Sequence, residues 1–302
     1  MGKAESKLKK KITPKLIFYC AMMVFPVLQF LVFYIGVNSQ SFLFAFQEYN
    51  QMDGTFKFDN HIFGNFATIW ESLTSGTKNL WWALKNSLLV WFFTSFLGTI
   101  VAVFFSYYIF KHAKSGRVFR FLLFLPSILP SMLLSIVFLC FVNDVLPIAL
   151  NIPKLLADGN DKFATILFYT IWIGFGTQVL LYTGSMEQVS TSVIEAGKID
   201  GATPMIELFL IVLPCIMPTI GTFLISGIAG TFINQANLFN FYGHGADPEF
   251  QTIGYHLFAS VTNPNEVSEV NYPYASALGL CCTVIAVPPT LLLRKVFARF
   301  EE

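Results

Sequence analysis

Residues 208–233 read LFLIVLPCIMPTIGTFLISGIAGTFI, a stretch of 26 residues without Asp, Glu, Lys or Arg. An ionised side chain at the centre of a bilayer costs about 2.5–3.5 kcal/mol on insertion scales, so the absence of charge is informative. A helix needs about 20 apolar residues to cross the hydrocarbon core of a membrane. The stretch therefore predicts a transmembrane helix.

The same pattern recurs along the whole chain of 302 residues, which is 55% hydrophobic and only 12% charged. Charges gather in clusters, and the stretches between them predict six spans. These lie at 16–37, 86–110, 121–142, 163–186, 208–233 and 272–293. Backbone groups in lipid must bond within the chain, and no span shows the short alternating apolar segments of a barrel, so we expect helices. The predicted fold class is all-α, with one transmembrane domain at 16–300 behind a basic N-terminus at 1–15.

The distribution of Lys and Arg predicts the orientation in the membrane. If the N-terminus is cytoplasmic, the cytoplasmic segments hold 14 of these residues and the external segments hold 5. Cytoplasmic connections carry the excess of Lys and Arg in membrane proteins. Both termini and the loops 111–120 and 187–207 are therefore expected in the cytoplasm. The formal net charge of +1 results from this segregation and gives no reason to expect a nucleic-acid partner.

Residues that carry catalytic or ion-coupling chemistry are missing from the spans. The sequence has no Gly-x-x-x-x-Gly-Lys-Ser/Thr loop, so ATP hydrolysis would need a separate polypeptide. An ion-coupled transporter needs ionisable residues at membrane depth and an enzyme needs clustered reactive groups, so both readings are disfavoured. His244 and His256 have no nearby Cys, which disfavours a metal site. We expect no catalytic residue, metal or cofactor here, and we expect the five cysteines to be buried packing residues.

The loop before residue 208 is densely patterned and reads SVIEAGKIDGATP from Ser192 to Pro204. Ser192 followed three residues later by Glu195 predicts a capping box at the start of a short helix. Asp200-Gly201 predicts its end, because Gly readily takes the left-handed conformation found there. The first half of the loop is thus expected to be a short helix closed by a glycine turn.

The second half of the loop carries the signals of a new helix. Thr203 is placed to cap it, Pro204 suits its first position, and Glu207 in the first turn complements its positive end. A short helix held rigidly between two spans is what a membrane domain needs to exchange force with a soluble motor.

These residues resemble the EAA motif of ABC importer permeases, Glu-Ala-Ala-x-x-x-Gly with a trailing Ile-x-Leu-Pro. The matching residues are Glu195, Ala196, Gly197, Asp200, Gly201 and Ala202, followed by Phe209, Ile211, Leu213, Pro214 and Pro218. Gly197 departs from the motif's second Ala and would loosen the helix by up to ~1 kcal/mol. The Asp-Gly-Ala triplet favours the sugar-type branch.

The resemblance to maltose-type sugar permeases covers about 15–300. It rests further on the basic N-terminus, on Asn86-Ser87 and on Trp172-Ile173-Gly174-Phe175. It implies a type I ABC importer permease of the bacterial inner membrane. In that family the short helix docks on a nucleotide-binding subunit, so Glu195 would be the ionic contact, Gly201 the turn, and Ala196 and Ala202 close-packing faces.

The resemblance also implies the partners of the chain. These are a second homologous permease subunit, two ATPase subunits that hold ATP and Mg, an extracellular or lipid-anchored solute-binding protein, a sugar or oligosaccharide substrate, and membrane lipid. An importer permease for another small solute stays open as an alternative, and an ion-coupled secondary transporter is the weaker one.

The substrate path is expected where small and weakly polar residues interrupt the fourth and fifth spans. In the maltose-type pattern these two spans supply the sugar contacts, and the candidates are Gly174, Thr177, Ser226, Gly230 and Asn234. Small residues let a ligand approach, and hydroxyls and amides bond sugar hydroxyls. The alternative is that the small residues serve only helix packing.

Overall fold

The computed structural model describes residues 14–50, 55–58, 63–74, 79–157, 161–262 and 272–300. Most of the predicted basic N-terminus, 1–15, lies outside this range. Six described helical segments are long and apolar enough to cross a membrane, which confirms the predicted all-α class and span number. They are Phe18–Phe44, Leu80–Lys111, Ser131–Leu150, Lys162–Met186, Pro204–Gly230 and Tyr272–Phe297.

The described part of the chain is mostly helical and includes one small hairpin. Its elements are α1 (Pro14–Gln29), α2 (Val37–Phe44), β1 (Gln47–Asn50), β2 (Thr55–Phe58), α3 (Gly64–Thr74), α4 (Asn79–Trp91), α5 (Gly98–Lys111), α6 (Ala113–Ile128), α7 (Ser131–Cys140), α8 (Leu146–Leu150), α9 (Lys162–Met186), α10 (Thr191–Ile199), α11 (Pro204–Ile206), α12 (Leu213–Gly230), α13 (Leu238–Tyr242), α14 (Ile253–Thr262) and α15 (Tyr272–Phe297). Short π-helical segments at Phe30–Gly36, Phe92–Leu97, Phe141–Val145 and Glu207–Val212 join some of these helices. The strands β1 and β2 pair antiparallel, with Gln47 opposite Phe58.

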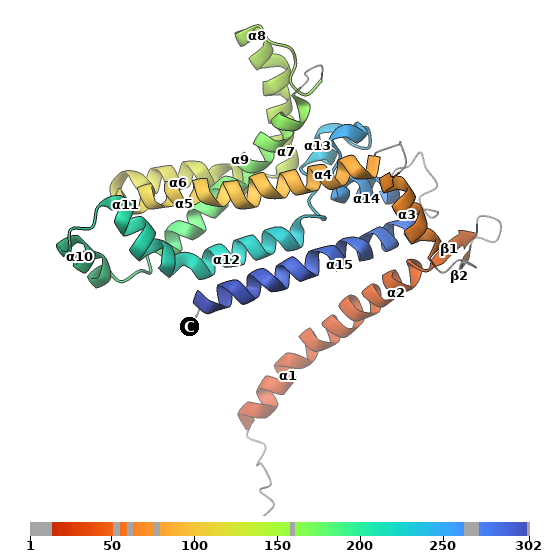
Figure 1. Ribbon diagram of the computed structural model, residues 1–302, viewed down its shortest axis with the longest axis horizontal. Coiled ribbons are helices and arrows are strands. Elements are labelled where there is room, and N and C mark those ends of the chain that lie inside the picture. Colours follow the sequence, from red (N-terminus) through yellow and green to blue (C-terminus); the bar gives the residue numbers. More distant parts are fainter. Residues whose placement is uncertain are drawn as a thin grey trace, which may run out of the picture.

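The long helices run side by side and define two ends of the molecule (Figure 1). One end carries α10 and the C-terminus, and we call it the α10 end. The opposite end carries the β1–β2 hairpin with α3, α13 and α14, and we call it the hairpin end. The first span, α1 with α2, diverges from the bundle, and none of its apolar window is buried within the chain. Its apolar surface is thus left exposed by the rest of the chain.

The third predicted span, 121–142, is wrong as a single continuous helix. The chain ends α6 at Ile128, leaves Leu129 extended with φ −74° and ψ 146°, and begins α7 at Ser131. Pro130 explains the break, because its ring disfavours helical backbone in the preceding residue and it lacks an amide hydrogen. The segment α6 packs along α5 and α9, whereas α7 leaves the bundle at a steep angle (Figure 1).

The expectation of buried cysteines is correct only for Cys282. Cys281 is partly buried, and Cys20, Cys140 and Cys215 are exposed. These three lie on helix faces that point away from the bundle, where a thiol meets lipid or a partner as an apolar group would.

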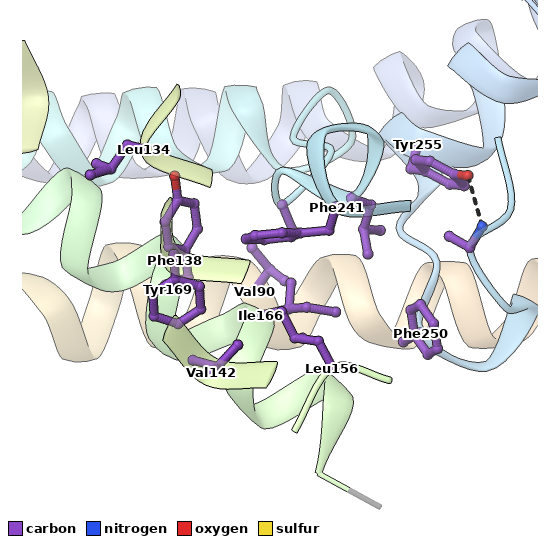
Figure 2. Packing of buried hydrophobic residues seen from close by; sticks show 13 residues of the cluster. Val90, Leu134, Phe138, Val142, Leu156, Ile166, Tyr169, Phe241, Phe250 and Tyr255 are labelled. Carbon is purple, nitrogen blue, oxygen red and sulfur yellow. Dashed lines mark hydrogen bonds between the residues drawn. The ribbon is translucent and has the colours of Figure 1, made fainter. Parts of the chain in front are cut away.

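Among the described residues, three apolar clusters hold the bundle together, and two of them lie at opposite ends of it. At the α10 end, Val179, Tyr182 and Met186 of α9 are fully buried against the second and fifth spans. At the hairpin end, α7, α9 and α13 meet in the aromatic cluster of Figure 2, where the rings of Tyr169 and Phe241 lie 4.9 Å apart. The Tyr169 hydroxyl lies 2.9 Å from the Ser135 hydroxyl, so its polar group is satisfied inside the cluster.

The Asn86-Ser87 pair anchors the hairpin end to the second span. The Asn86 side-chain amide donates to the carbonyl oxygens of Glu249 at 2.8 Å and Gln251 at 3.0 Å. The Ser87 hydroxyl accepts from the Ile253 amide at 2.8 Å. Both side chains are buried, and these bonds satisfy backbone groups of residues 249–253, which lead into α14. The pair therefore has a structural reason to occur where the resemblance placed it.

Two glycines of α9 differ sharply in their surroundings. A Cβ on Gly176 would lie 1.8 Å from the Leu123 carbonyl oxygen and 3.0 Å from the Phe124 Cα, both on α6. A Cβ on Gly174 would meet nothing within 4 Å. Gly176 thus permits the close backbone approach of α6 and α9, as small residues do in membrane bundles.

We expect Gly176→Ala to destabilise the folded chain by about 1–3 kcal/mol, because the backbone of α6 has to move away. The matched variant Gly174→Ala meets no neighbour and should raise stability by up to ~1 kcal/mol. Thermal unfolding of both variants in the same detergent checks this. Equal unfolding temperatures for the two would contradict the assigned α6–α9 contact.

Candidate coupling surface and substrate path

The helix α10 begins two residues earlier than the predicted cap implies. Its N-cap is Ser190, with extended backbone at φ −57° and ψ 128°, and Thr191 is the first helical residue. The predicted capping box of Ser192 with Glu195 is therefore wrong, because Ser192 already lies inside the first turn. The Ser192 hydroxyl lies instead 2.7 Å from that of Ser190.

The end of α10 follows the prediction from Asp200-Gly201. Gly201 has φ +82°, its amide donates to the Lys198 carbonyl at 3.1 Å, and the Ala202 amide donates to the Gly197 carbonyl at 2.9 Å. This pair of bonds is a Schellman motif, which satisfies the last carbonyls of the helix. The turn holds the chain in one conformation between α10 and the next helix.

The start of the next helix also follows the prediction. The Thr203 side chain accepts from the Ile206 amide at 3.4 Å, and Pro204 occupies the first helical position. Glu207, predicted only to complement the positive end of this helix, is buried and forms an ion pair with Lys111 of α5. Sequence reasoning missed this partner because it lies 96 residues away along the chain.

One face of α10 is exposed and carries both acids and apolar groups. We call Val193, Glu195, Ala196, Ile199 and Asp200 the α10 surface, since all five are exposed. Ile199 is 87% exposed, which is unusual for a residue of its size on a short helix outside the bundle. An apolar group next to two carboxylates suits contact with a basic protein surface.

The opposite face of α10 packs on the membrane bundle. Ile194 is buried, and a Cβ on Gly197 would lie 2.4 Å from the Ile211 Cδ1 atom. The departure of Gly197 from the motif's alanine therefore makes room for Ile211, itself part of the motif. Helix α10 is thus in direct contact with the beginning of the fifth span.

A cavity of about 270 Å³ lies between the second, fourth and fifth spans. Three of the five predicted path residues line it, namely Ser226, Gly230 and Asn234. Gly174 and Thr177 do not line it. The remaining lining residues are Trp91, Thr94, Ser95, Gln178, Phe223, Gly227 and Thr231.

The second span contributes cavity residues that sequence reasoning missed. Trp91, Thr94 and Ser95 are spaced i, i+3 and i+4, which places them on one face of a helix. That spacing was visible in the sequence, but nothing local indicates that this face meets the fifth span. The contact is a property of the tertiary fold.

The chemical character of the cavity is polar but uncharged. None of its ten lining residues is Asp, Glu, Lys, Arg or His. The indole Nε1 of Trp91 is buried and has no hydrogen-bond acceptor among the described residues. A buried donor without a partner costs free energy unless a ligand or water fills the role. Such a cavity suits a neutral ligand with hydroxyl groups.

Comparison with known proteins gives matches along most of the chain. The chain is 24% identical to MsmF, a multiple sugar-binding transport system permease protein of Streptococcus mutans, over 62% of this chain and 66% of that protein. It is 24% identical to MalF, the maltose/maltodextrin transport system permease protein of Escherichia coli, over 51% of this chain and 31% of that protein. A probable ABC transporter permease of Mycoplasma pneumoniae, the MG188 homolog, is 27% identical over 86% and 80% of the two chains. The chain thus spans less than two thirds of MsmF and about a third of MalF.

Two solved structures share the fold. One is a bacterial alginate ABC transporter in complex with an alginate pentasaccharide-bound periplasmic protein, with a TM-score of 0.75, 18% identity, and coverage of 98% of both chains. The other is a bacterial ABC transporter involved in the import of the acidic polysaccharide alginate, with a TM-score of 0.76, 18% identity, and coverage of 97% and 99%. At 18% identity, these two structures establish the fold of the chain and nothing more.

The family model of binding-protein-dependent transport system inner membrane components matches residues 94–301, which is 208 of the 302 residues. The matched range includes α10, the fifth span and most of the cavity. The chain belongs to the family of binding-protein-dependent transport system inner membrane components.

Proposed function

We propose that the chain is a permease subunit of an ATP-binding-cassette importer and forms, with a second permease, the path for a sugar or oligosaccharide delivered by a solute-binding protein. The observation that carries the proposal is the α10 surface, an exposed patch on a helix that packs against the start of the fifth span. Named relatives that are sugar permeases support the substrate class. The chain has no P-loop, so separate nucleotide-binding subunits supply ATP and Mg.

The mechanism is alternating access. ATP draws two nucleotide-binding subunits together, each moves the short helix docked on it, and the cavity opens toward the loaded binding protein. Hydrolysis then resets the path. The C-terminus lies at the same end as α10 (Figure 1), which supports the proposed cytoplasmic placement of both.

The second permease is proposed because this chain has only a small cavity and leaves a large apolar surface uncovered. A cavity of about 270 Å³ is smaller than typical ligand sites, which span roughly 300–1,000 Å³. The unburied first span supplies apolar area for such a partner. The two permeases would then enclose the sugar between them.

The α10 surface is tested by Glu195→Lys in the complete transporter, reconstituted in proteoliposomes. Reversing a charge at a docking interface costs several kcal/mol, so ATP-driven uptake of neutral oligosaccharides should fall by about tenfold or more while membrane insertion is retained. Glu71→Lys on α3, exposed at the hairpin end, is the control and should transport normally. Uptake that survives Glu195→Lys contradicts the docking role.

The cavity is tested by Asn234→Ala. A lost hydrogen bond to a neutral group is worth about 0.5–1.5 kcal/mol, which predicts a roughly two- to tenfold higher KM for sugar uptake. The control is Thr222→Val on the fifth span. Thr222 is exposed, as Asn234 is, its hydroxyl donates to the Pro218 carbonyl, and it does not line the cavity. An unchanged KM in Asn234→Ala, or an equal rise in the control, removes the cavity from the path.

A further inference from the structure

The loop that carries α10 has an acid at each of its two ends, and each acid has a cation from the preceding connection. Glu187 follows the last residue of α9, and Glu207 follows the last residue of α11. Arg120 of α6 pairs with Glu187, and Lys111, the last residue of α5, pairs with Glu207. The residues 111–120 thus hold the α10 loop at both ends.

The Lys111–Glu207 pair is the buried one. The Lys111 Nζ atom lies 2.6 Å from one Glu207 carboxylate oxygen and 2.5 Å from the other. The Glu207 side chain is only 3% exposed, and the ammonium also lies 5.6 Å from the centre of the Tyr107 ring. Removing one partner of such a pair leaves an uncompensated buried charge, which is strongly unfavourable.

Tyr107 adds a second link at the same place. Its hydroxyl donates to the Pro204 carbonyl at 2.8 Å, one turn of α5 before Lys111. The last turn of the second span therefore binds Pro204, the first residue of α11, and Glu207, the residue that follows α11. The beginning of the fifth span cannot shift along α5 without breaking a hydrogen bond and a buried ion pair.

The Arg120–Glu187 pair is the weaker of the two. Glu187 is 50% exposed, and exposed ion pairs contribute little because water screens them. The two ends of the loop are therefore held unequally. The Glu207 end is held more strongly than the Glu187 end.

The Glu207 end connects the two helices that meet at the cavity. Trp91 and Ser95 lie on the second span, and Ser226 and Asn234 lie on or directly after the fifth. Because α10 packs on Ile211, a displacement of α10 acts first on the fifth span. The Lys111–Glu207 pair ties the second span to the same part of the fifth, beside the apolar cluster that the two spans share.

We propose that Lys111 and Glu207 are positioning residues that make the second and fifth spans move together when α10 is displaced, so that the motion reaches both walls of the cavity. The inference rests on the proposed function, because it assumes that a motor displaces α10. The Lys111–Glu207 pair would pass the movement of α10 on within this chain, and this role is separate from the docking contact of Glu195.

The first test measures hydrogen exchange of the amides of residues 194–202 in the complete transporter in nanodiscs. Lys111→Met and Glu207→Gln should each raise the exchange rate about tenfold, because the loop is released at its more strongly held end. Lys111→Arg, which keeps the pair, should stay within about twofold of wild type. Lys162→Met, which removes an ion pair with Asp247 at the hairpin end, is the control and should change nothing.

The second test measures transmission and needs no sugar. Ser95→Cys, in a chain whose native cysteines are replaced by alanine, reports cavity opening through its alkylation rate by a maleimide. Trapping the motor with ATP and vanadate should change this rate several-fold with the Lys111–Glu207 pair intact, and should leave it unchanged with Glu207→Gln. The double variant Lys111→Met with Glu207→Leu leaves no buried unpaired charge, so it should fold and still fail to transmit.

Three results decide between the claims. Wild-type exchange in Lys111→Met and Glu207→Gln, or full transmission in the double variant, overturns the inference. Transmission that is retained in Lys111→Arg but absent in Glu207→Gln supports it. If vanadate trapping leaves the alkylation rate at Ser95→Cys unchanged even with the Lys111–Glu207 pair intact, the proposed motor-driven function fails. The hydrogen-exchange experiment alone then decides whether the pair holds the α10 loop.

Discussion

The lack of water in the bilayer core is the constraint on which the rest of this structure depends. Backbone groups there must bond within the chain and ionisable groups are costly, so the chain crosses as helices and collects its charges at the ends. The few charged residues consequently lie where they can form specific ion pairs and exposed acidic patches. At the α10 end they form the Lys111–Glu207 and Arg120–Glu187 pairs, and they supply the acids of the α10 surface.

Local features of the fold were predictable from the sequence, and features that depend on distant partners were not. The six spans follow from apolar stretches, and the glycine turn at Gly201 follows from a rule that involves neighbouring residues only. The break after Ile128 was visible as Pro130, but the apolar stretch around it outweighed that signal. Ser190 and Ser192 are both suitable caps, and only the backbone conformation distinguishes them.

The candidate site divides in the same way. The sequence motif located α10, because its pattern lies within about a dozen neighbouring residues. The cavity needed three spans to be placed together, so Trp91, Ser95 and Gln178 escaped prediction while Ser226, Gly230 and Asn234 did not. Glu207 was expected only to complement the positive end of its own helix, although its main partner, Lys111, is on α5.

The central claim is that a separate ATPase subunit binds this chain through the α10 surface. Electron cryomicroscopy of the complex purified from native membranes through a tag on this chain tests it most directly. The account predicts a nucleotide-binding subunit seated on α10, with a second permease facing the cavity. A particle without any ATPase subunit, or one whose ATPase contacts the chain elsewhere and leaves α10 in solvent, would contradict it.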